Sequence, residues 1–215
     1  SRSLKEVVRH LAKEFSQSDF KPIACELKIG KDGIPLNFQY DGGEIIVNGS
    51  IDRVDEYNGF IRIIDYKTGS KSFKLPDILF GLNLQMLLYL YAVIRADKGD
   101  DNLAAGILYM TSKRDLNDEG MAMNGLIKAD MQVVSAMEKE NKGEFVPILK
   151  TNRDGSISKT CSSFIESEEF SKIFGVSAIF QRIFQRKTFG LIADGSLQRN
   201  SLPRHTAHGI YFGGT

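Results

Sequence analysis

The stretch that decides the fold runs from Gly49 to Lys67 and reads GSIDRVDEYNGFIRIIDYK. At its centre, Asn58-Gly59 is the strongest short signal for a two-residue β-hairpin turn, because such a turn needs a positive φ at its central positions. Strand-like apolar runs flank the turn, at 44–54 and 60–66. We therefore expect two antiparallel strands that are neighbours in one sheet.

Three charged side chains gather on one face of this expected hairpin. Asp65 and Lys67 point the same way because side chains alternate along a strand, and the antiparallel partner places Asp52 across from Asp65. Two carboxylates this close repel unless a cation lies between them, and hard oxygen ligands favour Mg²⁺ or Mn²⁺. Lys67 would stand beside the metal, where it could hold a water or offset charge on a phosphate. The alternative for an Asp-x-Lys motif alone is an exposed ion pair without catalytic importance.

Working outward from the hairpin, periodicity and turn residues predict an α-β-β-β-α-β order. The further expected elements are a helix at 1–17, an extended segment at 23–29, turns at 31–43, a helix at 76–96 and a buried strand at 103–110. The helix at 76–96 is apolar almost all round, which is typical of a helix buried against a sheet. Gln85 and Tyr89 are four residues apart on this helix and share a face, so they either line the carboxylate site or hydrogen-bond within the core.

Signals weaken after residue 112. We expect a helix at 126–139, a short extended segment at 145–149, a turn at Asp154-Gly155 and helices at 166–185 and 188–194. The resulting division is a core at 1–112, a C-terminal helical and extended region of the same domain at 113–195, and a polar tail at 196–215.

The composition is that of a globular protein. The chain has 215 residues, a formal net charge of +1 and 42% hydrophobic residues, which excludes intrinsic disorder. No apolar run approaches the ~20 residues of a membrane span, so we expect no membrane association. Two cysteines far apart, Cys25 and Cys161, indicate a reducing, cytoplasmic setting. The near-zero charge means that any DNA-binding surface is local. Because the chain begins with Ser1, we expect a trimmed piece of a longer protein.

Three motifs together resemble the RecB-type nuclease domain of the PD-(D/E)XK superfamily. They are GSIDRVD at 49–55, IDYKTG at 64–69 and QMLLY at 85–89. The resemblance is closer to one branch, the C-terminal nuclease domains of bacterial ATP-dependent helicase/deoxyribonuclease B subunits. The segments that carry it are FKP at 20–22 leading to Glu26, FGLNLQ at 80–85 and AGILY at 105–109. It covers residues 20–110 well and continues weakly to about 195.

The resemblance implies a restriction-endonuclease-like α/β core, with a mixed β-sheet flanked by helices. It implies a Mg²⁺- or Mn²⁺-dependent DNA exonuclease that hydrolyses phosphodiester bonds during double-strand break processing and recombinational repair. The implied partners are DNA, a helicase–nuclease partner subunit and the motor part of the parent chain, since this chain has no phosphate-binding GxxxxGK[ST] loop.

Carried over residue by residue, the resemblance implies a set of roles. Asp52, Asp65 and the backbone carbonyl of Tyr66 would hold the metal, and Lys67 would be the catalytic lysine. The remaining catalytic residues would be Gln85 and Tyr89 on the DNA side, with Glu26 as a supporting acid behind the ligands. Independently of the resemblance, the loops beside the expected site offer Lys71, Lys74, Lys113 and Arg114 as candidates for contacts with DNA phosphates, with plain surface charge as the alternative. Arg53 is a further candidate for such a contact.

Two departures from the family pattern affect the expected activity. The family has a further acid or histidine on a helix upstream of the first core strand, and His10 does not stand in a matching context. Its B subunits carry an iron–sulfur cluster on four cysteines, whereas this chain has two cysteines. We therefore expect no iron–sulfur cluster and weak or no activity from this chain alone. The alternative function is a nuclease-like DNA-binding or assembly module without turnover.

Overall fold

The structure of the protein is a computed structural model, which describes residues 4–40, 43–67, 84–97, 103–111, 122–140, 142–158, 163–166, 168 and 206–211. The helices within this part of the chain are α1 (Leu4–Gln17), α3 (Leu84–Asp97) and α4 (Met131–Met137). The strands are β1 (Lys21–Ile29), β2 (Asn37–Tyr40), β3 (Gly43–Tyr57), β4 (Phe60–Lys67), β5 (Ala104–Thr111), β6 (Asn124–Lys128), β7 (Phe164–Ile165) and β8 (Thr206–Tyr211).

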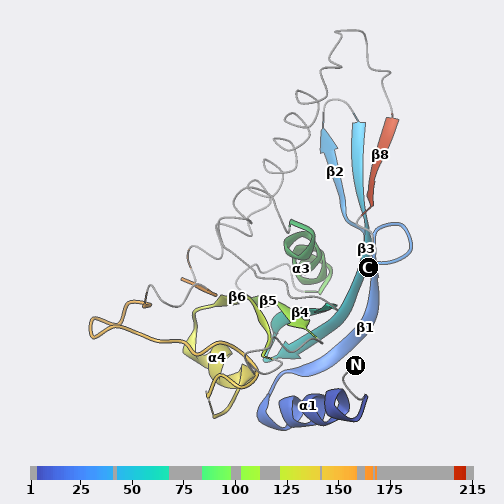
Figure 1. The fold of residues 1–215 in the computed structure, drawn as a ribbon. Helices are drawn as coiled ribbons and strands as arrows, with labels where there is room; N and C mark the ends of the chain where they lie inside the picture. Colours follow the sequence, from blue (N-terminus) through green and yellow to red (C-terminus); the bar gives the residue numbers. More distant parts are fainter. Residues whose placement is uncertain are drawn as a thin grey trace, which may run out of the picture.

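The described strands form one mixed sheet with helices on both faces. The main order is β1-β3-β4-β5-β6-β7, and β2 and β8 also pair with β3. The β4–β5, β6–β7 and β3–β8 pairs are parallel and the other pairs are antiparallel. Helix α3 covers one face, and α1 and α4 lie on the other (Figure 1). This is the expected α/β architecture of a mixed sheet flanked by helices.

Strand β3 connects two parts of the sheet. Its first residues, 43–48, pair with β8, and 43–46 also pair with β2, so these three strands form an arm that projects from the main sheet (Figure 1). From Gly49 onward β3 pairs with β1, and from Arg53 onward it also pairs with β4. The point at which β3 passes from the arm into the main sheet is therefore the step from Asn48 to Gly49.

The expected hairpin between β3 and β4 is confirmed. Asn58 and Gly59 both have positive φ, 48° and 87°, as a two-residue hairpin turn requires. The antiparallel register runs from Tyr57 opposite Phe60 to Arg53 opposite Ile64.

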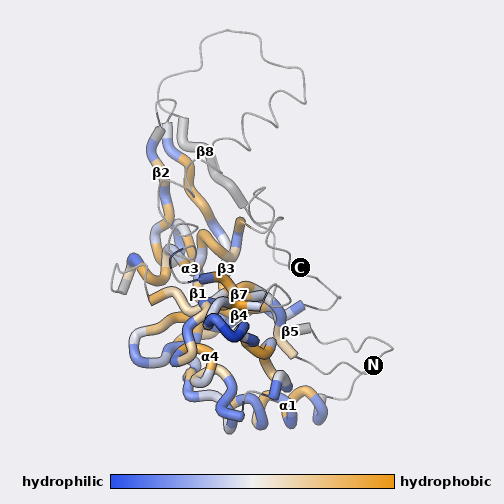
Figure 2. Tube along the Cα trace, turned by 90° about the vertical axis from the view of Figure 1, so that its left-hand side faces the viewer, coloured by the Kyte–Doolittle hydropathy of each residue, from blue (hydrophilic) through white to orange (hydrophobic). Residues whose placement is uncertain are grey.

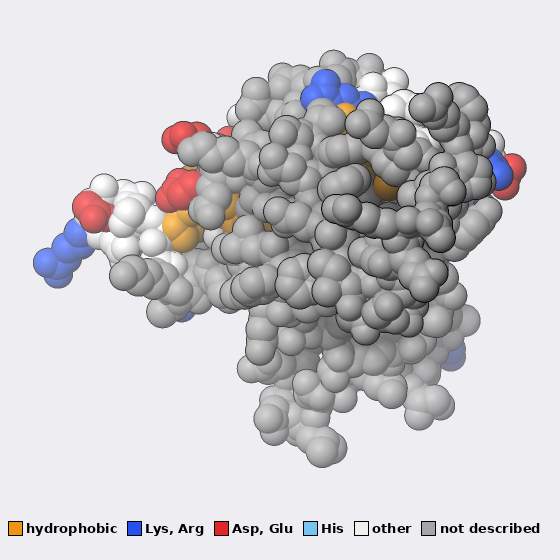
Figure 3. Space-filling view, turned by 90° about the horizontal axis from the view of Figure 1, so that it is seen from above, with side chains coloured by type: hydrophobic (Ala, Val, Ile, Leu, Met, Phe, Trp, Pro, Cys, Tyr) orange, Lys and Arg blue, Asp and Glu red, His pale blue; other side chains and the backbone are white. Residues whose placement is uncertain are grey.

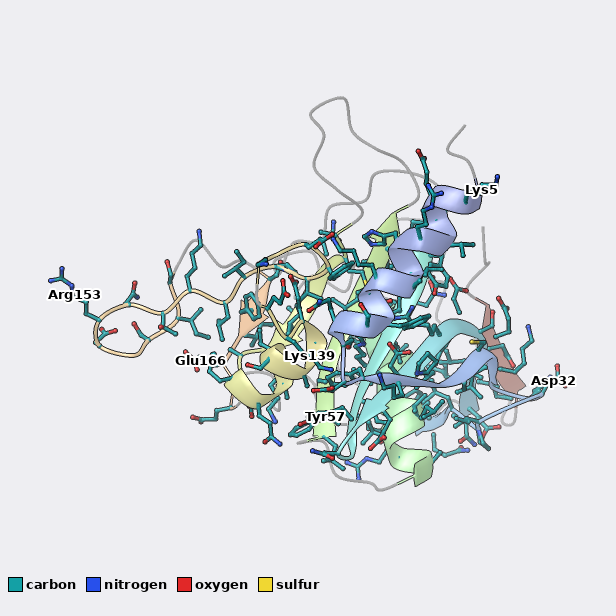
Figure 4. All side chains as sticks on the ribbon, turned by 90° about the horizontal axis from the view of Figure 1, so that it is seen from below. Lys5, Asp32, Tyr57, Lys139, Arg153 and Glu166 are labelled. Atoms are coloured by element: carbon teal, nitrogen blue, oxygen red, sulfur yellow. The ribbon has the colours of Figure 1, made fainter. Side chains whose placement is uncertain are left out.

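Hydrophobic side chains form one cluster on each face of the sheet. Toward α3, buried Val54 and Ile63 pack in the same cluster as Leu87 and Leu90. Toward α1 and α4, Ile64 belongs to a second cluster that includes Phe20 and Val133. Helix α1 alternates between hydrophobic and hydrophilic positions (Figure 2) and lies across the strands (Figure 4), as the periodicity of 1–17 predicts.

The expected helix at 126–139 is wrong. Residues 126–139 do not form one helix: β6 ends at Lys128 and α4 begins at Met131. The side chain of Asp130 ends the strand and caps the helix by accepting from the backbone N–H groups of Gln132 (2.9 Å) and Val133 (3.4 Å). The segment 145–149, which was expected to be extended, belongs to no helix or strand. A turn does lie at Asp154-Gly155, where Gly155 has a φ of 83°.

The sequence did not predict strands β2, β7 and β8. Residues 31–43 contain β2 as well as turns, and the tail at 196–215 contributes β8, which pairs with the arm of β3. Strands β6 and β7 continue the main sheet beyond residue 112. The expected start of the helix at 76–83 and nearly all of 166–194 lie outside the described residues. No helix within the described ranges has the length and apolar character needed to cross a membrane.

Candidate active site at the β3–β4 hairpin

Asp52 and Asp65 lie next to each other, as the hairpin predicts. Continuing the register one step beyond Arg53 and Ile64 places the two aspartates opposite each other. Contact between the strands is direct, because the Oδ2 atom of Asp52 accepts a hydrogen bond of 2.7 Å from the backbone N–H of Tyr66, the residue after Asp65. The carboxylate of Asp52 is thereby held at the end of β4.

Lys67 completes the charged group. Its Nζ atom lies 2.8 Å from Oδ2 of Asp65, and the Lys67 and Asp65 side chains are 22% and 15% exposed. Such limited exposure reduces the screening of the pair by solvent compared with a pair on the open surface. Among the described residues, two carboxylates and one ammonium group thus lie together at this end of the hairpin.

Helix α3 brings Gln85 and Tyr89 to the same place. The Nε2 atom of Gln85 donates to the hydroxyl of Tyr89 (3.3 Å), and this hydroxyl donates to the backbone carbonyl of Asn48 on β3 (3.3 Å). Tyr89 is fully buried. Burial raises the pKa of Tyr89, the hydrogen bond from Gln85 lowers it, and the negative charge of Asp65 raises it. Tyr89 therefore faces the side of the sheet that carries Asp65.

A second buried tyrosine, Tyr109, flanks Asp65 from the other neighbouring strand. In the parallel register of β4 and β5, Tyr109 pairs with Asp65, and its side chain is only 3% exposed. Burial, and then the charge of Asp65, raise the pKa of Tyr109. Tyr109 is not among the residues that the sequence predicts for the site. The signal that could have found it was the expected strand at 103–110, whose parallel pairing with β4 brings a polar hydroxyl beside a carboxylate.

Arg53 does not contact the surface, so its assignment to a DNA phosphate is wrong. The guanidinium is 2% exposed and points to the α1 face. It donates to both oxygens of Glu14 (2.8 and 3.1 Å), to Asp55 (2.9 Å) and to the hydroxyl of Tyr66 (3.2 Å). The alternation of β3 already indicates this outcome, because Arg53 and Asp52 are adjacent and must point to opposite faces.

The same buried network includes Arg62 on β4. Its guanidinium bonds Asp55 (2.8 Å) and Glu14 (2.7 Å), and Glu14, Asp55 and Arg62 are fully buried. Two acids and two bases therefore neutralise one another beneath α1. Burial lowers the pKa of Arg53, but the charges of Asp55 and Glu14 outweigh this and raise it. The guanidinium groups of Arg53 and Arg62 both bond Glu14, and so they fix α1 to the strands that carry the candidate site.

The pairing of β1 with β3 places Glu26 near the site, but its side chain is exposed. Its neighbours Cys25 and Leu27 pair with Arg53 and Ile51, so Glu26 falls opposite Asp52, with a positive φ of 51°. Within the described ranges, no three His, Cys, Asp or Glu side chains converge as a metal-binding group. The part of the site that the structure describes thus offers two carboxylates and, from Tyr66, a backbone carbonyl.

The other expected phosphate contacts, Lys71, Lys74, Lys113 and Arg114, lie outside the described residues. Seen from above, the described acidic and basic side chains form no continuous patch of one sign on the visible face (Figure 3).

Comparison with known proteins gives one consistent family. Residues 1–163 match the PD-(D/E)XK nuclease superfamily. The B subunit of an ATP-dependent helicase/deoxyribonuclease from Clostridium acetobutylicum is 35% identical over 198 residues, which is 79% of this chain. Proteins of the same name from Acetivibrio thermocellus and Clostridioides difficile are each 34% identical, over 74% and 78% of this chain. The matched region makes up 17% of each relative, so the chain spans about a sixth of their length.

Proposed function

Because the chain belongs to the PD-(D/E)XK nuclease superfamily, we propose that Asp52, Asp65 and Lys67 form the active site of a metal-dependent deoxyribonuclease that hydrolyses phosphodiester bonds. One observation carries this proposal. The hairpin brings the two carboxylates together, with the Lys67 ammonium 2.8 Å from Asp65, at a place that is neither fully buried nor open to solvent.

The donor set suits Mg²⁺ or Mn²⁺. Both ions prefer oxygen ligands, and Mg²⁺ keeps several waters, so that one or two carboxylates suffice to hold it. Asp52, Asp65 and the backbone carbonyl of Tyr66 would be the ligands. When bound, such a cation polarises a phosphoryl oxygen and lowers the pKa of a water.

The chain's own residues position and balance charge around this site. The N–H of Tyr66 holds the Asp52 carboxylate at the end of β4, so that the ligand is preorganised. Lys67 offsets the negative charge that develops on the phosphate in the transition state, and it can hold a water by hydrogen bonding. Gln85, half-buried on α3, lines the DNA side of the site, and Glu26 would support the ligands from β1.

The relatives suggest the larger setting. Their name describes part of an ATP-dependent helicase and deoxyribonuclease. We propose that this chain is the nuclease part of such a subunit, that it acts on DNA as an exonuclease in double-strand break processing in the cytoplasm, and that it works with a motor region of its own parent chain and with a partner subunit. In this proposal the chain alone is a weak nuclease.

A second function is favoured by one observation. Among the described residues no third acidic or histidine side chain joins Asp52 and Asp65. A site with only two carboxylates binds a cation more weakly, so the domain could serve as a DNA-binding or assembly module without turnover.

The experiment that separates the two functions is a titration with Mg²⁺ and Mn²⁺, followed by cleavage assays on single- and double-stranded DNA. The nuclease proposal predicts cleavage that rises with either ion and stops when a chelator is added. DNA binding without cleavage at any concentration of either ion would support the module instead.

A further inference from the structure

Gly49 occupies a position on β3 where space, not backbone conformation, requires a glycine. It is not among the glycines with positive φ, so an alanine could adopt its backbone angles. A Cβ atom built at Gly49 would lie 1.6 Å from the hydroxyl oxygen of Tyr89 and 2.6 Å from its Cζ atom. The nearest atoms all belong to Tyr89. The missing side chain of Gly49 therefore provides the volume that the end of the Tyr89 ring fills.

Asn48, the residue before Gly49, supplies the acceptor for the Tyr89 hydroxyl. The Tyr89 hydroxyl donates its proton to the backbone carbonyl of Asn48 (3.3 Å). The side chain of Asn48 is itself fixed, because its Oδ1 atom accepts from the backbone N–H of Lys31 (3.1 Å). These contacts lie at the step from Asn48 to Gly49, where β3 leaves the arm and enters the main sheet.

This geometry gives Tyr89 a positioning role. A hydroxyl has one proton, and Tyr89 gives it to Asn48, while its oxygen accepts from Nε2 of Gln85 (3.3 Å). The ring is fully buried and does not extend into solvent. Gln85 lies one helical turn earlier and is half-buried, so it is the member of the pair that can reach a substrate.

We propose that Asn48 and Gly49 form a seat for Tyr89, and that the seated Tyr89 is a positioning residue that orients the Gln85 amide toward the Asp52–Asp65 side of the sheet. The second half of this inference rests on the proposed nuclease function. The first half, the steric fit between Gly49 and Tyr89, does not depend on any activity.

The steric half is tested by thermal unfolding of the purified protein. Overpacking makes us expect Gly49→Ala to lower the Tm by roughly 5 °C or more. In a Tyr89→Leu background, which removes both the hydroxyl and Cζ, the same Gly49→Ala change should shift the Tm by less than about 2 °C. Tyr89→Phe keeps Cζ and should give only partial relief. Ser50→Ala, on the same strand, is the matched control and should leave the Tm near that of the parent.

An equal loss of Tm on Gly49→Ala in the parent, in Tyr89→Phe and in Tyr89→Leu would overturn the seat. If Gly49→Ala fails to fold, recovery of folded protein in Gly49→Ala/Tyr89→Leu supports the seat, and failure to recover it, while Tyr89→Leu alone folds, contradicts it.

The positioning half is tested by the kinetics of DNA cleavage. We expect Tyr89→Phe and Gln85→Ala each to lower kcat/KM by on the order of 10-fold, and the double variant to be no more than about twofold worse than either single one. Effects that multiply would show that Tyr89 does not act through Gln85. If the parent protein cleaves no DNA, the proposed function and the positioning half fail together, whereas the Tm series still decides the steric seat.

Discussion

The two faces of the β3–β4 hairpin use charge in opposite ways. On the α1 face, two acids and two bases are at most 2% exposed and neutralise each other: Glu14, Arg53, Asp55 and Arg62. On the α3 face, the charged groups that the structure describes at the end of the hairpin are Asp52, Asp65 and Lys67, and the Asp65–Lys67 pair keeps some exposure. The same two strands carry both sets at alternating positions. A balanced, buried set can only hold the fold together, whereas an unbalanced, accessible set can take up a cation.

Tyr66 belongs to both faces. Its hydroxyl accepts from Arg53 on the α1 face, while its backbone N–H holds the Asp52 carboxylate. The buried network therefore supports the candidate site through the main chain of one residue, and changes on the two faces should be separable in experiments.

The largest separable effect is expected for Lys67→Met. This change removes the cation beside Asp65 and should lower the rate of DNA cleavage by on the order of 100-fold or more, because a fixed charge at a developing oxyanion contributes several kcal/mol. Steady-state cleavage assays measure the rate, and circular dichroism checks the fold. Cleavage within a few-fold of the parent rate would remove Lys67 from the site.

On the opposite face, Arg62→Met should affect stability instead. It leaves Asp55 and Glu14 with one cation between them, and breaking a buried ion pair costs about 3–5 kcal/mol in the free energy of unfolding. Urea denaturation gives this value. At a temperature where the variant is folded, its cleavage rate per folded molecule should stay close to that of the parent. Normal stability with lost cleavage would contradict the division between the faces.

The tyrosines beside Asp65 predict a loss of stability at high pH. The pKa of Tyr109 is raised in the folded state, so above about pH 10 the unfolded chain loses a proton that the folded chain keeps. The free energy of unfolding should then fall by about 1.4 kcal/mol per pH unit for this group. Denaturation of the parent and of Tyr109→Phe between about pH 9 and 11 gives the slope of the free energy of unfolding against pH for each protein. The Phe variant should have the shallower slope, and equal slopes would contradict the assignment.

The smallest effect is expected for an ion pair that belongs to neither face. Lys139 and Asp19 lie 2.8 Å apart but their side chains are 48% and 42% exposed. Lys139→Ala should lower the free energy of unfolding by less than about 1 kcal/mol, since exposed pairs are screened by water. A loss of free energy of unfolding as large as that of Arg62→Met would show that burial does not decide how much an ion pair contributes to stability.

The sequence was sufficient for the hairpin and for its charged face. Asn58-Gly59 fixes the turn, the turn fixes the register, and the register places Asp52 opposite Asp65. These are local signals, which one stretch of chain contains completely. The Arg53 assignment failed because alternation shows which face a side chain takes, but not that Glu14, 39 residues earlier, covers that face.

Elements defined by distant or subtle signals were missed. Strand β8 is formed by pairing with β3, which lies more than 150 residues earlier in the chain. No periodicity within the tail indicates this strand. Asp130, a good N-cap residue, is the sequence signal for the break between β6 and α4. This signal was missed because the apolar residues on both sides of Asp130 also fit a helical pattern. Likewise, the space that Tyr89 takes at Gly49 is a property of two elements in contact.

The measurement that tests the central claim most directly is DNA cleavage by Asp65→Asn over a range of Mg²⁺ and Mn²⁺ concentrations, with unfolding of the same preparation measured in parallel. Asparagine has the shape of aspartate without its charge, so the fold should be retained. The proposed site predicts that cleavage is abolished at every metal concentration while the unfolding transition stays near that of the parent. Cleavage by Asp65→Asn as fast as that of the parent protein would contradict the assignment of this face as the active site.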